Sequence, residues 1–441
     1  MSTLFGTDGI RSRIGMHPFT AETLPLLGAA IAQWAQEKYG SSCTILLAHD
    51  TRQSCSWLKA SLKTGLLMHP ILLHDAYVLP TPAVLHLMNK HTHYNCGIVI
   101  SASHNPYYDN GIKLIDAQTG KLSLEDEKRI SDLFLKEHKK SYLHLGMEMP
   151  VFQAEDLYIN CVTGLFKDDF LKGYTLVLDV AHGATYQVAP RIFEKLGATT
   201  IILHNTPTGF NINESSGTLH PQKLQQAVIA HKAHIGFAFD GDGDRVIAVN
   251  QHGVLKDGDD LLFLLHTHPD YRHLQTLVGT VMSNQALEIH LKSQGKTLIR
   301  TPVGDKHVLE ALHSNKLSLG GEQSGHIILK NILNTGDGIL VALKLLETVK
   351  ATHNWDMVTF DKYPQIILNI SVKEKKDLKQ SPFAELIADY GKRLQSGRLI
   401  VRYSGTENKL RIMVEDKDET LTKRIAHDLA HLLEKMINQE G

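Results

Sequence analysis

Several short stretches of the sequence contain side chains that could handle a phosphoryl group, and the first of them surrounds Ser103. The stretch Ser101–Pro106 follows a short apolar run at 96–100, which has the β-branched character of a buried strand. Asn105 and Pro106 form a turn dipeptide, so Ser103 is expected at the end of that strand. Open α/β sheets bind their ligands at strand ends. Ser103 is therefore the candidate nucleophile.

Two other interpretations of Ser103 compete with this one. A hydrolase serine would lie in a G-x-S-x-G turn with a distant histidine as its base, and the sequence around Ser103 lacks both glycines. The nearest histidine, His104, is the next residue, so we expect its ring to point away from the serine oxygen. The third interpretation is an exposed loop serine without a role, and it would hold only if no further stretch suited phosphate.

The second stretch, Asp240–Arg245, reads D-G-D-G-D-R and lies between the apolar runs 235–239 and 246–249. This predicts a hairpin loop on which three carboxylates converge. Such carboxylates repel one another unless a cation lies between them, and their hard oxygens suit Mg²⁺. An EF-hand calcium loop is excluded, because it needs Gly at Arg245 and Glu at Gln251. A solvated acidic turn is the alternative.

Two further stretches could bind a phosphorylated sugar without a metal. In Arg402–Thr406 and the nearby Arg411, two guanidinium groups, hydroxyls and a glycine could form a phosphate cradle. The stretch Gly321–His326 places Glu, Gln, Ser and His between glycines, which suits sugar hydroxyls and supplies a titratable imidazole. Taken singly, each stretch could equally be an ordinary polar turn.

The composition excludes several classes of protein. Lys and Arg total 46 and Asp and Glu total 47, so the formal net charge is −1 and there is no basic field for nucleic acid or for a membrane surface. No apolar run reaches the ~18 residues of a membrane span, and residues 1–6 lack the features of a signal peptide. We therefore expect a cytoplasmic protein that binds neither nucleic acid nor a membrane.

Neither the cysteines nor the histidines predict a metal site. The stretches His91-Thr92-His93 and His266-Thr267-His268 have no other soft ligand at zinc spacing, so we expect solvated loop histidines. The cysteines show no C-x-x-C spacing and are interpreted as reduced packing residues. They are Cys43, Cys55, Cys96 and Cys161.

Strands alternate with helices along most of the chain, which predicts three consecutive α/β domains with mixed or parallel sheets. A chain of 441 residues is too long for one core, and we place these domains at 1–155, 156–253 and 254–364. A smaller C-terminal α+β domain follows at 365–441, and its last helix carries five apolar residues on one stripe. These five are Leu421, Ile425, Leu429, Leu432 and Met436.

The individual elements follow from hydrophobic periodicity. The predicted strands include 43–48, 71–73, 96–100, 175–179, 199–203, 277–282, 297–300, 398–403 and 410–414. The predicted helices include 20–38, 57–67, 189–196, 285–293 and 306–313.

Together, these stretches resemble the motifs of the α-D-phosphohexomutase family. The resemblance runs the length of the chain, and separated motifs in one order are more specific than any one of them. It implies four domains around a central cleft, each contributing one loop. The matching stretches are Phe5–Arg11, Ser101–Pro106 continued through Asp109–Lys113, Asp240–Arg245, Gly321–His326 and Ser404–Glu407.

The resemblance also implies a role for each stretch. Ser103 would carry the phosphoryl group, and Glu322 with Ser324 would bind sugar hydroxyls. One Mg²⁺ per subunit would be bound by a phosphoserine oxygen and by Asp240, Asp242 and Asp244. The phosphate that is not being transferred would be held by Arg402, Ser404, Gly405, Thr406 and Arg411. The acid–base candidates are Lys113, His326 and Arg11, in that order, with Arg245 as a donor beside the metal.

The implied reaction moves a phosphoryl group from one end of a sugar to the other. The phosphoserine enzyme would form a bisphosphate, which would turn around and return its other phosphoryl group to Ser103, with hexose bisphosphate as activator. Motif likeness, including Gln323, favours glucosamine phosphate and a supply of UDP-N-acetylglucosamine for the cell envelope. The alternatives are glucose or mannose phosphates, a non-catalytic sugar-phosphate sensor, and a phosphatase. A homodimer is compatible with the sequence, which does not fix the oligomeric state.

Overall fold

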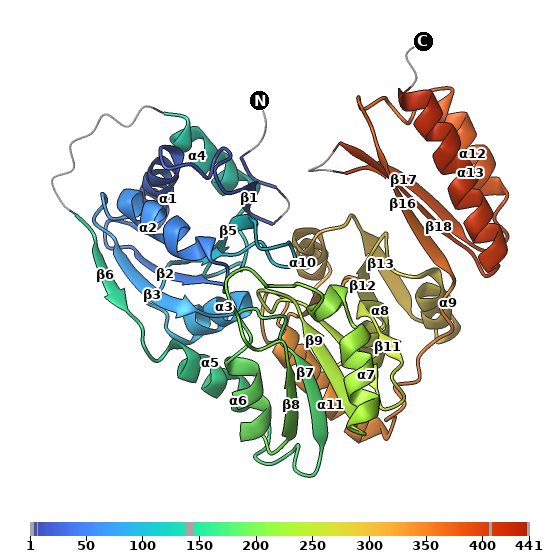
Figure 1. Cartoon of the computed structure of the whole chain (residues 1–441), viewed down its shortest axis with the longest axis horizontal. Coiled ribbons are helices and arrows are strands. Elements are labelled where there is room, and N and C mark those ends of the chain that lie inside the picture. Colours follow the sequence, from blue (N-terminus) through green and yellow to red (C-terminus); the bar gives the residue numbers. More distant parts are fainter. Residues whose placement is uncertain (1–3, 7, 137–144, 405–407, 439–441) are drawn as a thin grey trace. The chain divides into compact units, whose positions relative to one another are not determined.

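The computed structural model describes residues 4–6, 8–136, 145–404 and 408–438. The chain divides into two compact units, which are described separately below. One contains residues 1–281 and 299–358, and the other contains residues 282–298 and 359–441. Four sheets carry the architecture: three α/β sheets of mixed or parallel strands come first, and a smaller antiparallel sheet with its helices follows (Figure 1). This confirms the predicted fold class.

The first sheet has six strands in the order β1-β5-β4-β2-β3-β6. Its central strands are parallel and bury nearly every residue, as parallel strands covered on both faces do. The helices α1 and α2 cross so closely that a Cβ on Gly65 would lie 1.7 Å from the Pro25 carbonyl oxygen. The strands are Ile10–Arg13 (β1), Thr44–His49 (β2), Leu72–Val78 (β3), Cys96–Ile100 (β4), Asp109–Asp116 (β5) and Met147–Pro150 (β6). The helices are Thr23–Tyr39 (α1), Ser54–Leu66 (α2), Thr81–Lys90 (α3), Leu124–Phe134 (α4) and Ala154–Thr163 (α5).

The second sheet has the order β11-β10-β9-β7-β8, with β9 and β10 forming an antiparallel hairpin at one side of three parallel strands. The hairpin registers Phe239 opposite Val246, so residues 240–245 form its loop. The strands are Thr175–Asp179 (β7), Thr199–Leu203 (β8), Ile235–Phe239 (β9), Val246–Asn250 (β10) and Leu255–Lys256 (β11). The helices are Val188–Lys195 (α6), Gln222–Ala230 (α7) and the short 3₁₀ turn Gly217–Leu219.

The third sheet has the order β13-β12-β14-β15. Its last two strands are an antiparallel pair that registers Gly321 opposite Ile327. The strands are Thr276–Thr280 (β12), Thr297–Thr301 (β13), Leu319–Gly321 (β14) and Ile327–Leu329 (β15). The helices are Gly258–His266 (α8), Gln285–Ser293 (α9), Asp305–Ser314 (α10) and Gly338–Thr352 (α11).

The fourth sheet is antiparallel, in the order β16-β18-β17, and α13 packs on it. Its strands are Gln365–Ser371 (β16), Arg398–Tyr403 (β17) and Lys409–Glu415 (β18), and its helices are Phe383–Lys392 (α12) and Glu419–Asn438 (α13). The buried stripe of α13 includes Leu421, Ile425 and Leu429 as predicted, but then continues through Leu433 and Ile437. Leu432 and Met436 are only partly buried, because the contact follows the i±4 ridge, which is inclined to the helix axis.

Two of the helices that the sequence analysis did not predict, α3 and α8, are almost completely buried. Helix α3 buries all eight residues from Thr81 to Met88, and α8 buries every residue. A helix covered on all sides has no polar face, so its sequence lacks the amphipathic period on which the prediction depends. The same burial makes one histidine expectation wrong, because His266 and His268 are each only 2% exposed. Nε2 of His268 lies 3.1 Å from Oε2 of Glu347.

The cysteines agree with expectation. All four cysteines are free thiols, three of them buried. Within the described part of the chain, a search for a bilayer-spanning helix finds none.

Candidate active site

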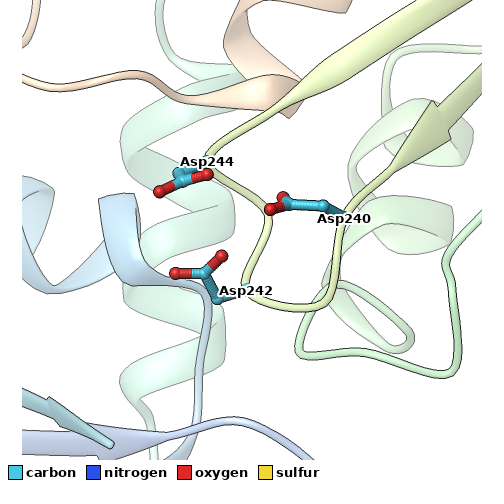
Figure 2. A group of neighbouring side chains, drawn as sticks. All are labelled: Asp240, Asp242 and Asp244. Atoms are coloured by element: carbon cyan, nitrogen blue, oxygen red, sulfur yellow. The ribbon is translucent and has the colours of Figure 1, made fainter. Parts of the chain in front are cut away.

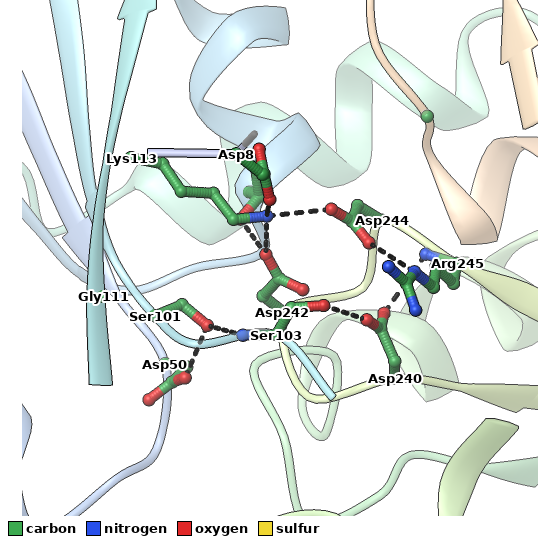
Figure 3. A network of polar contacts seen from close by, with 12 residues as sticks. Asp8, Asp50, Ser101, Ser103, Gly111, Lys113, Asp240, Asp242, Asp244 and Arg245 are labelled. Carbon is green, nitrogen blue, oxygen red and sulfur yellow. Dashed lines mark hydrogen bonds and ion pairs between the residues drawn. The ribbon is translucent and has the colours of Figure 1, made fainter. Parts of the chain in front are cut away.

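Ser103 lies in the loop that follows β4, and it is fully buried. Its Oγ donates a hydrogen bond to Oδ2 of Asp240 at 2.6 Å (Figure 3). Its φ of 52° is left-handed, which residues other than glycine seldom adopt. A buried serine held in a strained conformation and aimed at a carboxylate is not an exposed loop residue without a role.

His104 lies against Ser103, with its Nδ1 atom 3.3 Å from Ser103 Oγ. The expectation that this ring points away was wrong. Successive side chains point to opposite faces only in an extended strand, and the backbone at Ser103 is left-handed instead. Burial, with Arg245 and Arg11 contributing, lowers the pKa of His104 to about 3. The imidazole beside the serine is therefore neutral.

The acidic loop between β9 and β10 brings its three carboxylates together. Asp240, Asp242 and Asp244 are each buried, and one oxygen from each lies within 4.8 Å of the other two (Figure 2). The loop turns tightly at Gly243, whose φ is 75° and whose added Cβ would lie 2.5 Å from Thr185. The predicted convergence of the carboxylates is confirmed, and the solvated acidic turn is excluded by their burial.

Lys113, on β5, is the main counter-ion of this triad. Its Nζ lies 2.8 Å from Oδ2 of Asp8, 2.8 Å from Oδ2 of Asp242 and 2.9 Å from Oδ2 of Asp244 (Figure 3). Burial opposes its charge, but the carboxylates of Asp242, Asp244 and Asp8 raise the pKa of Lys113 well above its ordinary value. The β4–β5 register, with Val99 opposite Lys113, places this ammonium beside the strand that leads to Ser103.

The triad fits a divalent cation. Burial, followed by the charges of Asp244 and Asp242, raises the pKa of Asp240 well above its usual range. Oδ1 of Asp242 and Oδ1 of Asp244 are buried and accept no hydrogen bond within the described residues. Oxygen atoms with unused lone pairs in a buried acidic site are the donors that Mg²⁺ prefers. A cation there would stabilise the carboxylate form of all three residues.

Arg245 and Arg11 reach the site in different ways. The backbone N–H of Arg245 donates to Oδ1 of Asp240 at 3.1 Å, and its Nε is 3.8 Å from Oδ1 of Asp244. Burial notwithstanding, Asp244 and Asp240 raise the pKa of Arg245. Arg11, on β1, instead contacts Oδ2 of Asp8 at 3.1 Å, and its side chain is 31% exposed. Its link to the triad therefore runs through Asp8 and Lys113.

His326 follows the turn between β14 and β15 and is buried. Its Nδ1 lies 3.7 Å from Oδ1 of Asp244, and its Nε2 accepts the N–H of Gly336 at 3.2 Å. Accepting that hydrogen bond keeps Nε2 unprotonated and places the ring proton on Nδ1, toward Asp244. A second proton on His326 therefore requires the hydrogen bond from Gly336 to break.

The predicted sugar-binding loop packs against the acidic hairpin. The N–H of Val246 donates to the carbonyl of Gly325 at 3.1 Å, and a Cβ on Gly325, where φ is 94°, would lie 2.2 Å from the carbonyl oxygen of Val246. Glu322 is buried and accepts the N–H of Gly304 at 2.9 Å, whereas Ser324 is exposed. The loop thus keeps one fixed carboxylate and one accessible hydroxyl.

The predicted phosphate cradle belongs to the second unit. Arg402 and Arg411 are direct cross-strand partners on β17 and β18, and burial, followed by Arg411, lowers the pKa of Arg402. Ser404 is buried, and its carbonyl accepts a hydrogen bond from Lys375 at 3.0 Å. The other two predicted members, Gly405 and Thr406, lie outside the described residues.

The structure adds residues to which the sequence analysis gave no role. Asp8 pairs with Lys113 and, at 2.7 Å, with Lys121. Asp8 lies within Phe5–Arg11, one of the stretches that resemble the family motifs, so the sequence did contain a signal for this residue. Thr81, whose hydroxyl donates to Oδ2 of Asp242, had no such signal, because it is a single uncharged residue at the start of α3.

Family models match almost the whole chain. The four domains of the phosphoglucomutase/phosphomannomutase family match in order: alpha/beta/alpha domain I at residues 2–141, domain II at 156–253, domain III at 257–361 and the C-terminal domain at 367–432. A phosphoglucosamine mutase from Acinetobacter baumannii (strain ACICU) is 40% identical, covering 97% of each chain. One from Bdellovibrio bacteriovorus is 38% identical, covering 99% of each chain.

Solved structures agree in fold. A phosphoglucomutase/phosphomannomutase family protein from Burkholderia thailandensis superposes with a TM-score of 0.79 at 22% identity, covering 99% of this chain and 97% of that one. An N-acetylphosphoglucosamine mutase from Aspergillus fumigatus, in complex with GlcNAc-6P and magnesium, gives a TM-score of 0.69 at 16% identity, covering 98% and 96%. With relatives of about 40% identity along nearly its full length, the chain belongs to the phosphoglucomutase/phosphomannomutase family, as a phosphohexomutase of the phosphoglucosamine mutase group.

Proposed function

We propose that the chain interconverts glucosamine 6-phosphate and glucosamine 1-phosphate through a phosphoserine at Ser103 and a glucosamine bisphosphate. The observation that carries the proposal is the 2.6 Å hydrogen bond from Ser103 Oγ to Asp240, one member of a buried cation-binding triad. A phosphoryl group on that oxygen would therefore lie beside the cation. The substrate is taken from the phosphoglucosamine mutases to which the chain is similar.

Phosphoryl transfer needs positioning and neutralisation of charge more than covalent chemistry from the protein. Mg²⁺ bound by Asp240, Asp242 and Asp244, and by a phosphoserine oxygen, would supply most of that neutralisation. Arg245 donates to phosphoryl oxygens at the same end, because its guanidinium lies against Asp244. Lys113 keeps Asp242 and Asp244 oriented through its two ion pairs.

The remaining roles concern the sugar and the second phosphate. Glu322 and Ser324 bind sugar hydroxyls, one as a fixed acceptor and the other as an accessible hydroxyl. The phosphate that is not being transferred is held by Arg402, Ser404, Gly405, Thr406 and Arg411. Two separate phosphate sites allow the bisphosphate to bind in either direction, which the reaction requires. A hexose bisphosphate would act as the activator, whatever group first phosphorylates Ser103.

Proton transfer to and from the sugar hydroxyl is assigned to the groups around Ser103. Lys113 and His326 remain the first two candidates and Arg11 the third, since the contact of Arg11 with the site, as far as the described residues show it, runs through Asp8. His104 joins them, because its ring nitrogen is 3.3 Å from Ser103 Oγ. Replacing each in turn and measuring kcat in both directions of the reaction identifies which group moves the proton.

The first experiment is the intact mass of the purified protein, with peptide mapping around Ser103, before and after incubation with glucosamine 6-phosphate, Mg²⁺ and a hexose bisphosphate. We expect one phosphoryl group on Ser103 and formation of the 1-phosphate isomer. A Ser103→Ala variant should lose both. A chain that binds the sugar phosphate but never carries a phosphoryl group on Ser103 would instead be a sensor.

Two further outcomes separate the remaining alternatives. Release of inorganic phosphate equal to substrate loss, without the isomer, would indicate a phosphatase. A kcat/KM that is higher for glucose or mannose phosphates than for glucosamine phosphate would reassign the substrate. Sedimentation of the same sample tests the homodimer, and the cytoplasmic location remains a proposal from the sequence.

A further inference from the structure

Arg52 is a fully buried arginine that touches neither the triad nor Ser103 Oγ. It follows β2, and its side chain is 0% exposed. All five N–H groups of its guanidinium have acceptors, which is the full donor inventory of an arginine. The Nε atom donates to Oδ2 of Asp50 at 2.8 Å. The other four N–H groups donate to backbone carbonyls of the serine loop, those of Ser103 (2.9 Å), Asn105 (2.8 Å), Asp109 (3.1 Å) and Pro106.

Asp50 extends this network to the other side of Ser103. The hydroxyl of Ser101 donates to Oδ2 of Asp50 at 2.6 Å, and the backbone N–H of Ser103 donates to the Ser101 hydroxyl at 2.9 Å (Figure 3). Both backbone polar groups of Ser103 are thus fixed from residues 50–52, its carbonyl directly by Arg52 and its N–H through Asp50 and Ser101. These hydrogen bonds stabilise the left-handed conformation of Ser103, whose φ of 52° is strained for a serine.

Two of the four carbonyls bound by Arg52 also accept hydrogen bonds from Asn213, which lies in the second α/β domain. Asn213 donates from Nδ2 to the carbonyl of Ser103 at 2.9 Å and to that of Asn105 at 3.1 Å. These bonds supplement the planar fork of Arg52 but do not reach Pro106 or Asp109. A lysine in place of Arg52 would keep the positive charge, but its ammonium could not satisfy these spread acceptors in one plane.

We propose that Arg52 is a positioning residue for phosphoryl transfer, which acts through the backbone of the serine loop and holds Ser103 Oγ toward the carboxylate triad. The inference rests on the proposed function of Ser103. The role depends on the planar guanidinium of Arg52, which binds the loop carbonyls, and on the hydrogen bonds through Asp50 and Ser101, which hold the N–H of Ser103.

The test is Arg52→Lys in the full-length enzyme, with glucosamine 6-phosphate, Mg²⁺ and hexose bisphosphate. We expect kcat to fall about 10- to 100-fold, because a displacement of ~1 Å at a reacting atom costs about 10²-fold in rate. KM should change less than about threefold, since the five guanidinium N–H groups of Arg52 donate to Asp50 and to backbone carbonyls of the serine loop, and none donates to Glu322 or Ser324. A misplaced phosphoserine should also lose more of its phosphoryl group to water, so the ratio of phosphate release to isomer formation should rise.

Two control variants separate positioning from stability. Arg129→Lys makes the same exchange at a surface ion pair with Glu37, and it should leave kcat unchanged. Ile45→Val removes one methylene from a fully buried side chain on β2 and destabilises the same domain, but it should leave the ratio of hydrolysis to isomerisation unchanged. Ser101→Ala breaks the link from Asp50 to the Ser103 N–H, so it should reproduce the kinetic signature of Arg52→Lys more weakly, even if Arg52→Lys fails to fold.

The outcomes distinguish this inference from the proposed function. If the wild-type enzyme carries no phosphoryl group on Ser103, the proposed function fails. If the wild-type enzyme forms phosphoserine and isomer, while Arg52→Lys and Ser101→Ala both keep the wild-type kcat and hydrolysis ratio, the positioning role is overturned. A change confined to thermal stability, like that expected for Ile45→Val, would likewise reduce Arg52 to a structural residue.

Discussion

The two units of the molecule each contain a cluster of like charges, and the clusters have opposite signs. In the first unit, Asp240, Asp242 and Asp244 converge and are buried. In the second unit, Arg402 and Arg411 are directly opposite each other on neighbouring strands, where like charges are unfavourable. Burial, followed by the like charges beside them, shifts a pKa in each cluster. The pKa of Asp240 is raised, and that of Arg402 is lowered.

The clusters differ in how their charged groups are held and in how far they are exposed to water. The acidic cluster has Lys113 between two of its carboxylates and Arg245 beside it, so its geometry is set before any ligand binds. The arginines are half-buried and keep access to water. We propose that the acidic cluster is a preformed cation site for chemistry, and that the basic cluster is an adaptable anion site for substrate affinity. The predictions below test that contrast.

The largest effect is expected for Asp240→Asn. The amide keeps the shape and can still accept the Arg245 N–H, but one buried negative charge disappears. We expect kcat to fall about a thousandfold, because a ligand of the proposed metal site is lost. The free energy of unfolding without metal should rise by about 1 kcal/mol, because burial, and after it the charges of Asp244 and Asp242, raises the pKa of Asp240 and disfavours its carboxylate, and a neutral amide avoids that cost. Activity and chemical denaturation with and without Mg²⁺ measure both.

The wild-type enzyme should also gain stability on addition of Mg²⁺, and Asp240→Asn should gain much less, because a ligand stabilises only the state that binds it. The matched control is Asp132→Asn on the surface of α4, where the carboxylate is exposed and paired with Lys128. That variant should keep wild-type activity and the full response to Mg²⁺. A metal-free Asp240→Asn less stable than the wild type would contradict the cation-site interpretation.

An intermediate effect is expected for Arg411→Gln in the second unit. We expect KM to rise about 10- to 100-fold, because a charge-assisted hydrogen bond to phosphate is worth about 1.5–3 kcal/mol. The change in kcat should be smaller, since this end of the substrate does not react. The free energy of unfolding without ligand should stay constant or rise by a few tenths of a kcal/mol, because the repulsion between Arg411 and its cross-strand neighbour Arg402 is removed.

Steady-state kinetics and denaturation of the free enzyme measure these two effects separately. Arg393→Gln is the control, because this exposed arginine of the same unit pairs with Asp389 on α12. An unchanged KM in Arg411→Gln, or a loss of kcat as large as that of Asp240→Asn, would remove the contrast between a catalytic and a binding cluster.

The local sequence pattern was enough to predict those features of the fold that depend on residues adjacent in the chain. The hairpin around Asp240–Arg245 follows from two apolar runs and its glycines, and the end of β4 at Ile100 follows from the run before Ser103. The motif resemblance added the family, which the relatives at 40% identity confirm. Both kinds of signal are carried by residues close together in the chain.

What depends on tertiary contacts could not be predicted in this way. The position of His104 follows from the left-handed backbone at Ser103, which is supported by Arg52, 51 residues earlier in the chain, and by Asn213, 110 residues later. The burial of His266 follows from the complete enclosure of α8. In each case the deciding partner is remote in sequence, and periodicity contains no information about it.

The smallest effect is expected at Asp116, a carboxylate that is bound by side chains of the protein itself. Asp116 accepts hydrogen bonds from Lys38 at 2.8 Å and Tyr39 at 2.5 Å. Burial alone would raise its pKa, but the bonds from Lys38 and Tyr39 lower it to about 2. A depressed carboxyl pKa stabilises the fold above the unfolded value of about 3.9, and that stability is lost as the pH falls toward 2.

Asp116→Asn should therefore destabilise the enzyme by about 1–2 kcal/mol at pH 7, allowing for solvent screening, and by progressively less between pH 4 and pH 3. Urea denaturation of both proteins at pH 7, 5, 4 and 3 measures the difference, with Asp132→Asn as the exposed control. If the difference in unfolding free energy did not depend on pH, Asp116 would stabilise the fold through its shape and not through its charge. The opposite signs expected for Asp116→Asn and Asp240→Asn follow from one cause, because a buried carboxylate stabilises the free enzyme only where the protein supplies its cation.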